Sequence, residues 1–207
     1  MTEHADHYFT ASPASRAALR PREVTLSGHR LTVQVASGVF SPGGVDRGTA
    51  VLLAEAPPPP AQGVFLDLGC GWGPIALSLA LRSPAATVYA VDVNERAVDL
   101  TARNAAAAGL DGVRATGPDG IPEGLDFDVI WSNPPIRVGK AALHDLLLTW
   151  LPRLAPEGVA HLVVAKNLGA DTLQQWLADT LGERFDVTRT ATAKGFRVLR
   201  VARKEQR

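Results

Sequence analysis

The sequence predicts an α/β domain in which helices cover both faces of a mainly parallel sheet. From residue 65 onward, short apolar runs alternate with segments of helical periodicity, which is typical of strands joined by crossover helices. A glycine-rich loop follows the first of these runs, as expected at a tight turn from strand to helix. Two further apolar runs end the chain as strands.

Composition limits the class of protein. The chain has 207 residues, 46% of them hydrophobic and 20% charged, which suits one globular domain with a substantial core. Lys plus Arg and Asp plus Glu both number 21, so the net charge gives no general attraction to nucleic acid or to anionic membranes. RNA binding would therefore need a local basic patch.

The sequence also disfavours several kinds of site. One cysteine excludes an internal disulfide, and no cluster of His and Cys has zinc-ligand spacing, so we expect no metal. No apolar stretch has the length of a membrane span, and the N-terminus lacks signal-peptide character. We expect a cytoplasmic protein that does not enter a membrane. Its oligomeric state does not follow from the sequence.

Residues 1–60 are expected to be an N-terminal extension of a single domain whose core is 61–207. The first 22 residues carry aromatic and basic side chains that either contact RNA or pin the segment onto the core: His4, His7, Tyr8, Phe9, Arg16, Arg20 and Arg22.

Within the extension, residues 23–26 and 31–35 alternate apolar and polar side chains, which predicts a β-hairpin that extends or flanks the main sheet. A short helix over 47–53 follows, with Asp46 as its cap. Prolines Pro57 to Pro60 then form a stiff connector, because proline fixes φ and offers no N–H to a helix.

The core elements are predicted in chain order from their periodicity. The expected strands are 65–68, 88–91, 113–116, 127–132, 160–165, 185–187 and 196–201. The expected helices are 74–81, 95–108, 141–151 and 172–181. Asn94 is a good N-cap for the second of these helices, and Gly109 stops it. A turn at Glu157-Gly158 precedes the fifth strand.

Asp67 and three alternating glycines follow the first core strand. Gly69, Gly71 and Gly73 let the backbone take positive φ and approach a ligand, which the free N–H groups of the next helix would face. Cys70 lies within this loop, where a packed side chain is favoured over a nucleophile. A tight turn without a ligand is the alternative interpretation.

A second carboxylate favours a nucleotide-like ligand. Asp92 follows the strand over 88–91, where an acid can accept hydrogen bonds from ribose hydroxyls. The spacing Gly-x-Gly-x-Gly differs from the Gly-x-Gly-x-x-Gly of dinucleotide sites, which argues against a nicotinamide cofactor. Strand ends at one edge of a parallel sheet converge, so Asp119 and Asn133 are expected near these acids.

With these motifs the chain resembles the class I S-adenosylmethionine (SAM)-dependent methyltransferases. The resemblance implies a Rossmann-like fold with a mainly parallel seven-stranded sheet, a C-terminal antiparallel pair and the N-terminal hairpin. It implies SAM as the cofactor, bound by Asp67, Gly69, Cys70, Gly71, Gly73, Asp92, Val93, Asp119, Gly120 and Asn133. In that family the acid matching Asp92 holds the ribose. Asp119 matches the position that binds the adenine amino group, although it also suits a simple turn.

In the same family, the pattern Asn-Pro-Pro-x marks enzymes that methylate a planar nitrogen. The implied catalytic residues are Asn133, Pro134, Pro135 and Ile136. The Asn133 side-chain oxygen and the Pro134 carbonyl can accept the hydrogens of that nitrogen and direct its lone pair. No strong base is needed, because the sulfonium is already activated, so neither His144 nor His161 is expected to be catalytic. A rigid strand terminator is the alternative.

The resemblance narrows to the methyltransferase-small domain of the 16S ribosomal RNA guanine-N2 methyltransferases. It rests on His7-Tyr8-Phe9, Gly38-Val39-Phe40-Ser41, Asp46-x-Gly48-Thr49, Asp92-Val93-Asn94-x-Arg96-Ala97 and the stretch from Asn133 to Lys140. It implies Phe40, Arg137 and Lys140 as substrate-binding residues. Larger members have an additional N-terminal domain and an aromatic-His pair after the prolines. This sequence has Ile136-Arg137 there, as in single-domain relatives.

We therefore expect a SAM-dependent N-methyltransferase acting on guanine N2 of 16S ribosomal RNA, with ribosomal RNA or the small ribosomal subunit as partner. A protein glutamine or a small heteroaromatic amine is the alternative acceptor. A SAM-binding or RNA-binding module without catalysis and a nicotinamide oxidoreductase are alternatives from other classes. The basic residues expected to favour RNA are Arg137, Lys140, Lys166, Lys194 and Arg197.

Overall fold

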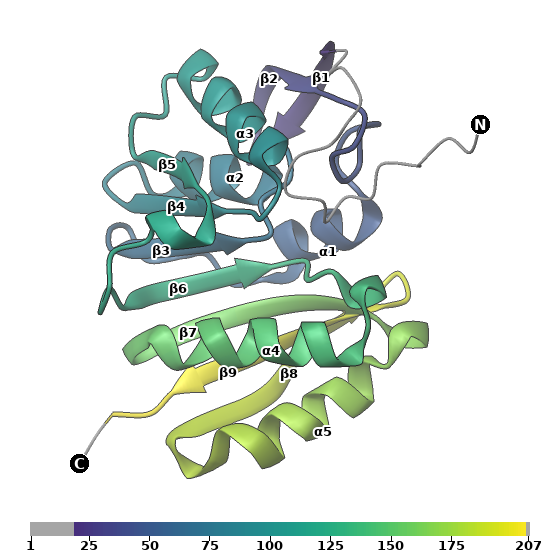
Figure 1. Ribbon diagram of the computed structural model, residues 1–207, viewed down its shortest axis with the longest axis vertical. Helices are drawn as coiled ribbons and strands as arrows, with labels where there is room; N and C mark the ends of the chain where they lie inside the picture. Colours follow the sequence, from purple (N-terminus) through teal and green to yellow (C-terminus); the bar gives the residue numbers. More distant parts are fainter. Residues whose placement is uncertain (1–18, 206–207) are drawn as a thin grey trace.

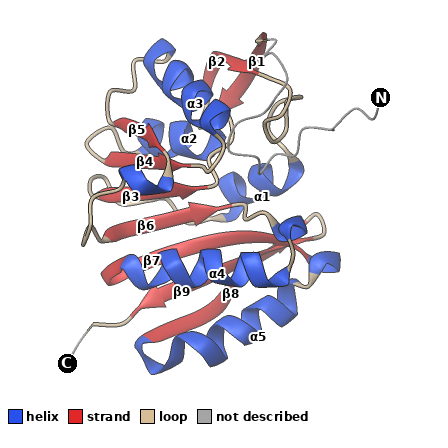
Figure 2. Ribbon diagram, in the orientation of Figure 1, coloured by secondary structure: helices blue, strands red, loops and turns tan. Residues whose placement is uncertain are grey.

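A computed structural model describes residues 19–205, which form a seven-stranded sheet covered by helices on both faces and a separate two-stranded hairpin (Figures 1 and 2). The order of strands in the main sheet is β5-β4-β3-β6-β7-β9-β8. Strands β3 to β7 pair in parallel, whereas β9 runs antiparallel to both β7 and β8. The fold class expected from the sequence is confirmed.

The elements follow one another as the periodicity predicts. The strands are β1 (Arg20–Leu26), β2 (His29–Val35), β3 (Val64–Leu68), β4 (Thr87–Val91), β5 (Val113–Thr116), β6 (Phe127–Ser132), β7 (Leu154–Ala165), β8 (Phe185–Ala193) and β9 (Phe196–Arg203). The α-helices are α1 (Arg47–Glu55), α2 (Pro74–Arg82), α3 (Glu95–Ala107), α4 (Lys140–Trp150) and α5 (Ala170–Leu181).

The starts of three helices have identifiable causes. The Asp46 carboxylate accepts from the Gly48 and Thr49 backbone nitrogens and caps α1. Asn94 Oδ1 accepts from the Arg96 nitrogen at 3.0 Å and caps α3. Helix α2 begins with Pro74 in its first turn, where the missing N–H costs nothing.

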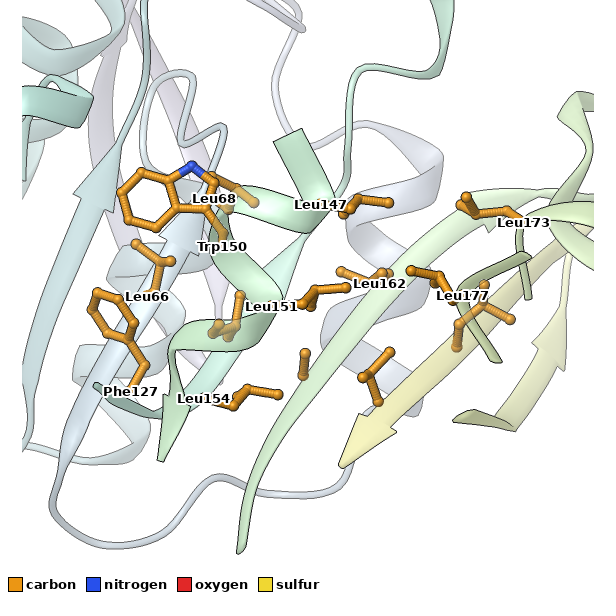
Figure 3. Packing of buried hydrophobic residues seen from close by; sticks show 14 of the residues in the cluster. Leu66, Leu68, Phe127, Leu147, Trp150, Leu151, Leu154, Leu162, Leu173 and Leu177 are labelled. Carbon is orange, nitrogen blue, oxygen red and sulfur yellow. The ribbon is translucent and has the colours of Figure 1, made fainter. Parts of the chain in front are cut away.

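Each face of the sheet is buried under its own helices. Helices α4 and α5 lie in front of the sheet in Figure 1. Figure 3 shows Leu147 and Trp150 of α4 and Leu173 and Leu177 of α5 in one buried cluster with strand residues such as Leu66 and Leu162. The opposite face packs against α1 and α2 through a second buried cluster. Because the two clusters cover the faces of the sheet, a ligand site is expected at the edge formed by the carboxyl ends of the parallel strands.

The hairpin of β1 and β2 does not extend the main sheet; it is a sheet of its own packed against α2 and α3. Leu26 and Val33 share a buried cluster with Trp72 from the glycine loop. Asn104 of α3 donates to the carbonyl oxygens of Gln34 at 3.0 Å and of Trp72 at 2.9 Å, and its Oδ1 accepts from the Gln34 nitrogen at 2.7 Å. The hairpin is thereby connected to the glycine loop through one side chain.

Two C-terminal strands are longer than the sequence predicts. Strand β7 begins at Leu154 rather than at residue 160, because Leu154 already pairs with Phe127 before the register shifts. The expected turn at Glu157-Gly158 lies inside this irregular stretch, where Glu157 has φ +64°. Strand β8 continues to Ala193, so its pairing with β9 is longer than expected.

Part of the sequence-based interpretation falls outside residues 19–205. The aromatic and basic residues of the first 18 positions, including His7-Tyr8-Phe9, belong to this part. Arg20 and Arg22 lie in β1. Between residues 19 and 205, no helix is long and apolar enough to cross a membrane.

Candidate active site

A cavity of about 520 Å³ opens at the carboxyl ends of the parallel strands. Its walls include residues that follow β3, β4 and β6, the end of β7, and the cap of α1. This volume falls in the range of pockets that hold nucleotide-sized ligands. The strand ends singled out in the sequence therefore do border one common space.

The glycine loop is closed against the neighbouring strand. Gly69, Gly71 and Gly73 have φ of +80°, +58° and +97°, values that favour glycine strongly. The backbone nitrogens of Gly69 and Cys70 both donate to the Val91 carbonyl, at 2.8 and 3.0 Å. The loop thus bends sharply between the end of β3 and the start of α2 while remaining bonded to the end of β4.

Asp92 connects the same two strand ends through its side chain. One carboxylate oxygen accepts from the Gly71 nitrogen at 3.0 Å, and the other accepts from the Asn94 nitrogen at 2.9 Å. The pKa of Asp92 is raised above its usual value, because the effect of burial exceeds the opposite effect of these backbone donors. Asp92 and Val93 both line the large cavity, and Val93 is 47% exposed.

Asp67 lies behind the loop rather than on the cavity wall. Its side chain is completely buried, and one oxygen accepts from the Ala76 nitrogen in the first turn of α2 at 2.9 Å. The other oxygen has no hydrogen-bond partner among residues 19–205. Burial raises the pKa of Asp67 to about 8, because a charged carboxylate is poorly solvated there.

Cys70 is a packed residue of the loop. Its side chain is 2% exposed, and the Thr101 hydroxyl lies 3.5 Å from its sulfur and 3.1 Å from the Gly71 carbonyl oxygen. Burial raises the pKa of the Cys70 thiol well above its usual value, so little nucleophilic thiolate forms. This environment does not suit a nucleophile.

The turn after β6 is a rigid one. Pro135 has φ −75° and ψ 75°, and the Ile136 nitrogen donates to the Pro134 carbonyl at 2.8 Å, which is an inverse γ-turn. One lone pair of the Pro134 oxygen is therefore used within the turn and one is left over. Asn133, Pro134, Pro135 and Ile136 all border the cavity.

The Asn133 side chain is bound at its nitrogen end. Its Nδ2 donates to Asp46 Oδ2 at 2.9 Å and to Thr49 Oγ1 at 3.1 Å. Within the part of the chain that the structure describes, no hydrogen bond is formed by Asn133 Oδ1. The amide therefore presents a carbonyl-type acceptor that no residue between 19 and 205 uses.

The structure brings most, but not all, of the expected site residues to the cavity. Those on its wall are Phe40, Gly69, Asp92, Val93, Asn133, Pro134, Pro135, Ile136 and Arg137. Cys70 and Gly71 line a smaller adjoining cavity of about 10 Å³. Asp67, Gly73, Asp119, Gly120 and Lys140 line neither, although Pro118 next to Asp119 does.

Three cavity residues have a role that the sequence did not suggest. Asp46 and Thr49 at the start of α1 bind Asn133, although Asp46 was expected only as a helix cap. Phe196 at the start of β9 lines the cavity beside them. The motif Asp46-x-Gly48-Thr49 was the available signal, but a cap and a site contact look alike in sequence.

Part of the cavity rim is formed by exposed apolar side chains. Among residues 19–205, Phe40, Val93 and Leu168 are exposed by 45%, 47% and 41%, and each lines the cavity. Exposed apolar side chains grouped at one opening are typical of a binding surface for a flat apolar ligand.

The basic residues expected to contact RNA do not all face solvent. Arg137, Lys140, Lys166 and Lys194 are exposed. Arg197 is instead 8% exposed and pairs with Asp171 at 2.6 Å, so the prediction that it presents a charge to RNA is wrong. No group of three or more His, Cys, Asp or Glu in the described range could hold a metal ion.

Comparison with known proteins gives concordant matches. A family model described as "Methyltransferase small domain" matches residues 30–200. The "Uncharacterized protein YbxB" of Bacillus subtilis (strain 168) is 32% identical over 199 residues, which are 95% of this chain and 98% of that protein. The "Ribosomal RNA small subunit methyltransferase C" of Pseudomonas aeruginosa (strain LESB58) is 38% identical over 159 residues, 74% of this chain and 47% of that protein.

A solved structure with the same fold is a T. Thermophilus 16S rRNA N2 G methyltransferase in complex with AdoMet and guanosine. It has a TM-score of 0.73 and 26% identity, and the match covers 93% of this chain and 52% of that one. The chain thus spans nearly all of the B. subtilis protein but about half the length of these two rRNA methyltransferases.

Proposed function

This chain belongs to the methyltransferase small domain family and is a SAM-dependent methyltransferase, and we propose that its acceptor is the exocyclic N2 amine of a guanine in 16S ribosomal RNA. The observation that carries the proposal is the Asn133 amide at the cavity wall, with its nitrogen bound to Asp46 and its oxygen without a hydrogen-bond partner among residues 19–205.

Asp92 is the proposed contact for the ribose of SAM. The Gly71 and Asn94 nitrogens each donate to one of its carboxylate oxygens, and the Val93 backbone N–H also favours the charged form; a carboxylate has about four acceptor sites, so acceptor capacity is left. Two acceptors side by side suit the two hydroxyls of a ribose. Val93, exposed at the same wall, offers apolar surface to the adenine. This arrangement fits the cofactor.

The glycine loop is the proposed contact for the methionine part of SAM. Gly69 has positive φ, and among residues 19–205 no heavy atom other than those of its chain neighbours lies within 4 Å of where a side chain would begin, so the backbone there is open to a ligand. Asp67 is proposed to support this loop from behind, through the bond that it accepts from the Ala76 nitrogen.

Asn133 and Pro134 are proposed to hold the acceptor amine. SAM supplies a methyl group on a positively charged sulfur. Asn133 Oδ1 and the second lone pair of the Pro134 oxygen accept the two amine hydrogens, which leaves the nitrogen lone pair directed at the methyl carbon. The new C–N bond forms as the C–S bond breaks, and the nitrogen then releases one proton to solvent. Alignment lowers most of the barrier, so no side-chain base is required.

A nucleobase suits the rest of the cavity. Phe40, Leu168 and Phe196 line the same cavity as Asn133 and supply apolar surface against which a flat ring can pack. Phe40 and Phe196 are proposed to provide the aromatic contact that Ile136 does not. Exposed Arg137 is proposed to contact a phosphate of the RNA.

The test is transfer of labelled methyl from SAM to ribosomal RNA that lacks the modification, offered both naked and in 30S subunits. Digestion to nucleosides should place the label in N2-methylguanosine, and the Asn133→Ala variant should transfer about 10²–10³ times more slowly. Label in another nucleoside would overturn the guanine assignment. With SAM binding established, a lack of label in any RNA would point to glutamine-containing proteins or small heteroaromatic amines.

A further inference from the structure

We infer that Asp46 and Thr49 are positioning residues that decide which end of the Asn133 amide faces the acceptor. The inference deepens the proposed function and rests on it. It concerns residues at the start of α1, which lie 87 and 84 positions before Asn133 in the chain.

Both oxygens that contact Asn133 Nδ2 act as hydrogen-bond acceptors, for different reasons. Asp46 Oδ2 is a carboxylate oxygen and therefore only accepts. Thr49 Oγ1 lies 2.5 Å from the same Asp46 oxygen, to which it donates its hydrogen, so its lone pairs face Asn133. The pair forms an acceptor surface that matches an NH₂ group.

Reversal of the amide would be doubly unfavourable. Asn133 Oδ1 would then face the Asp46 carboxylate and the Thr49 oxygen, with no hydrogen between them. The NH₂ group would instead face the acceptor amine, where donor would meet donor. The amide orientation that the two residues impose is the one that the proposed reaction needs.

The fold makes this contact possible by packing the start of α1 closely against Asn133. A side-chain carbon on Gly48 would lie 3.3 Å from Asn133 Nδ2, 3.2 Å from Asp46 Oδ1 and 3.1 Å from the Phe196 ring. Asp46 also caps α1, but serine caps a helix about equally well. Helix capping alone therefore does not require a carboxylate at this position, whereas the Asp46 carboxylate also accepts the hydrogen bond from Asn133.

The first test compares Asp46→Ser with the wild-type protein, because serine keeps the helix cap but replaces the acceptor-only carboxylate with a shorter hydroxyl that can also donate, so it no longer fixes the Asn133 amide. We expect single-turnover methyl transfer to fall roughly 10- to 100-fold, with the dissociation constant of SAM and the melting temperature nearly unchanged. Thr49→Val, which lacks the hydroxyl, should lower the rate by a smaller factor. Thr49→Ser, which keeps the hydroxyl, should transfer at the wild-type rate. Asp128→Ser is the matched control, since Asp128 accepts from the Val64 nitrogen at the start of β3.

A double-mutant cycle separates positioning from structural damage. If Asp46 acts through Asn133, Asp46→Ser should cause no further loss in the Asn133→Ala background. The same fold-loss in both backgrounds would overturn the inference. So would an unchanged rate in Asp46→Ser when Asn133→Ala is impaired.

A measurement without catalysis keeps this inference distinct from the proposed function. In wild-type protein, the two Nδ2 protons of Asn133 should give separate NMR signals that exchange slowly with solvent, and Asp46→Ser should speed their exchange. Equal exchange in the two proteins would refute the positioning role. If wild-type protein methylates no acceptor while this difference is present, the proposed function fails and the orientation of the amide is upheld.

Discussion

The Asp92 carboxylate accepts a hydrogen bond from the backbone nitrogen of Gly71 at 3.0 Å. This bond connects the acid after β4 to the loop after β3, which are the two elements proposed to contact SAM. The acid and the loop therefore form one unit, and a change at Asp92 should disturb both.

Replacement of Asp92 should weaken SAM binding more than it slows methyl transfer at saturating SAM. Loss of hydrogen bonds to a charged group costs about 1.5–3 kcal/mol, so Asp92→Ala should raise the dissociation constant roughly 10- to 100-fold. Asp92→Asn keeps one acceptor oxygen, so its dissociation constant for SAM should lie between those of the wild-type protein and Asp92→Ala. Isothermal titration calorimetry measures this, and an unaltered dissociation constant in Asp92→Ala would refute the ribose assignment.

Gly48→Ala should impair the reaction without unfolding the helix. Gly48 lacks a positive φ, so alanine suits its backbone, but the added carbon would press on Asn133 Nδ2 and the Phe196 ring. We expect roughly a tenfold slower transfer, about the effect of displacing one aligned group, with an unchanged melting temperature. Gly43→Ala is the control, since in the described part of the chain no heavy atom beyond its chain neighbours lies within 4 Å of its added carbon. Equal rates in the two variants would contradict the close packing at α1.

His161 should make stability depend on pH below neutrality. Its two ring nitrogens are buried without hydrogen-bond partners among residues 19–205, and burial lowers its pKa to about 4. The unfolded chain takes up a proton near pH 6.5 and the folded protein does not, so His161 stabilises less as the pH falls from 6.5 to 4. The expected loss is about 2–3 kcal/mol.

The measurement is the difference in free energy of unfolding between wild-type protein and His161→Leu. Asp67 titrates in the opposite sense, because its raised pKa of about 8 makes stability fall as the pH rises from 3.8. The wild-type curve alone therefore mixes both groups, whereas Asp67 cancels in the difference. A difference that stays constant between pH 7 and 4 would show that His161 titrates normally.

Arg137→Ala should weaken RNA binding in a salt-dependent way. An exposed guanidinium at the cavity that neutralises one phosphate releases about one counterion, so the slope of log affinity against log salt should fall by about 1. Arg137→Lys keeps the charge and should keep the slope. Arg103→Ala is the comparison, because Arg103 is exposed on α3, pairs with Asp99 and lines neither cavity. Equal effects of Arg137→Ala and Arg103→Ala would argue against a specific phosphate contact.

The order of core elements could be predicted because its signals are local. Asp46 and Asn94 cap their helices by bonds to nitrogens two or three residues away. The first part of β7 could not be predicted, since Pro156, Glu157 and Gly158 suggest a turn and only pairing with β6 extends the strand to Leu154.

The sequence allowed us to place site residues only where they directly follow a strand. Asp92 and Asn133 follow strands directly and reach the cavity. The burial of Asp67 behind its loop and the inward pairing of Arg197 depend on neighbours distant in sequence. The bond between Asp46 and Asn133 spans 87 residues, so the local motif Asp46-x-Gly48-Thr49 could suggest a helix cap but could not name its partner.

Asn104 gives the N-terminal hairpin a thermodynamic connection to the glycine loop. One amide bonds both to Gln34 of the hairpin and to Trp72 of the loop, and the apolar side chains around it belong to both. Separation of the hairpin from α3 would expose Trp72 and leave buried polar groups of the loop unpaired. The hairpin and the core should therefore unfold in a single cooperative transition, and SAM should raise the melting temperature of the hairpin as much as that of the loop.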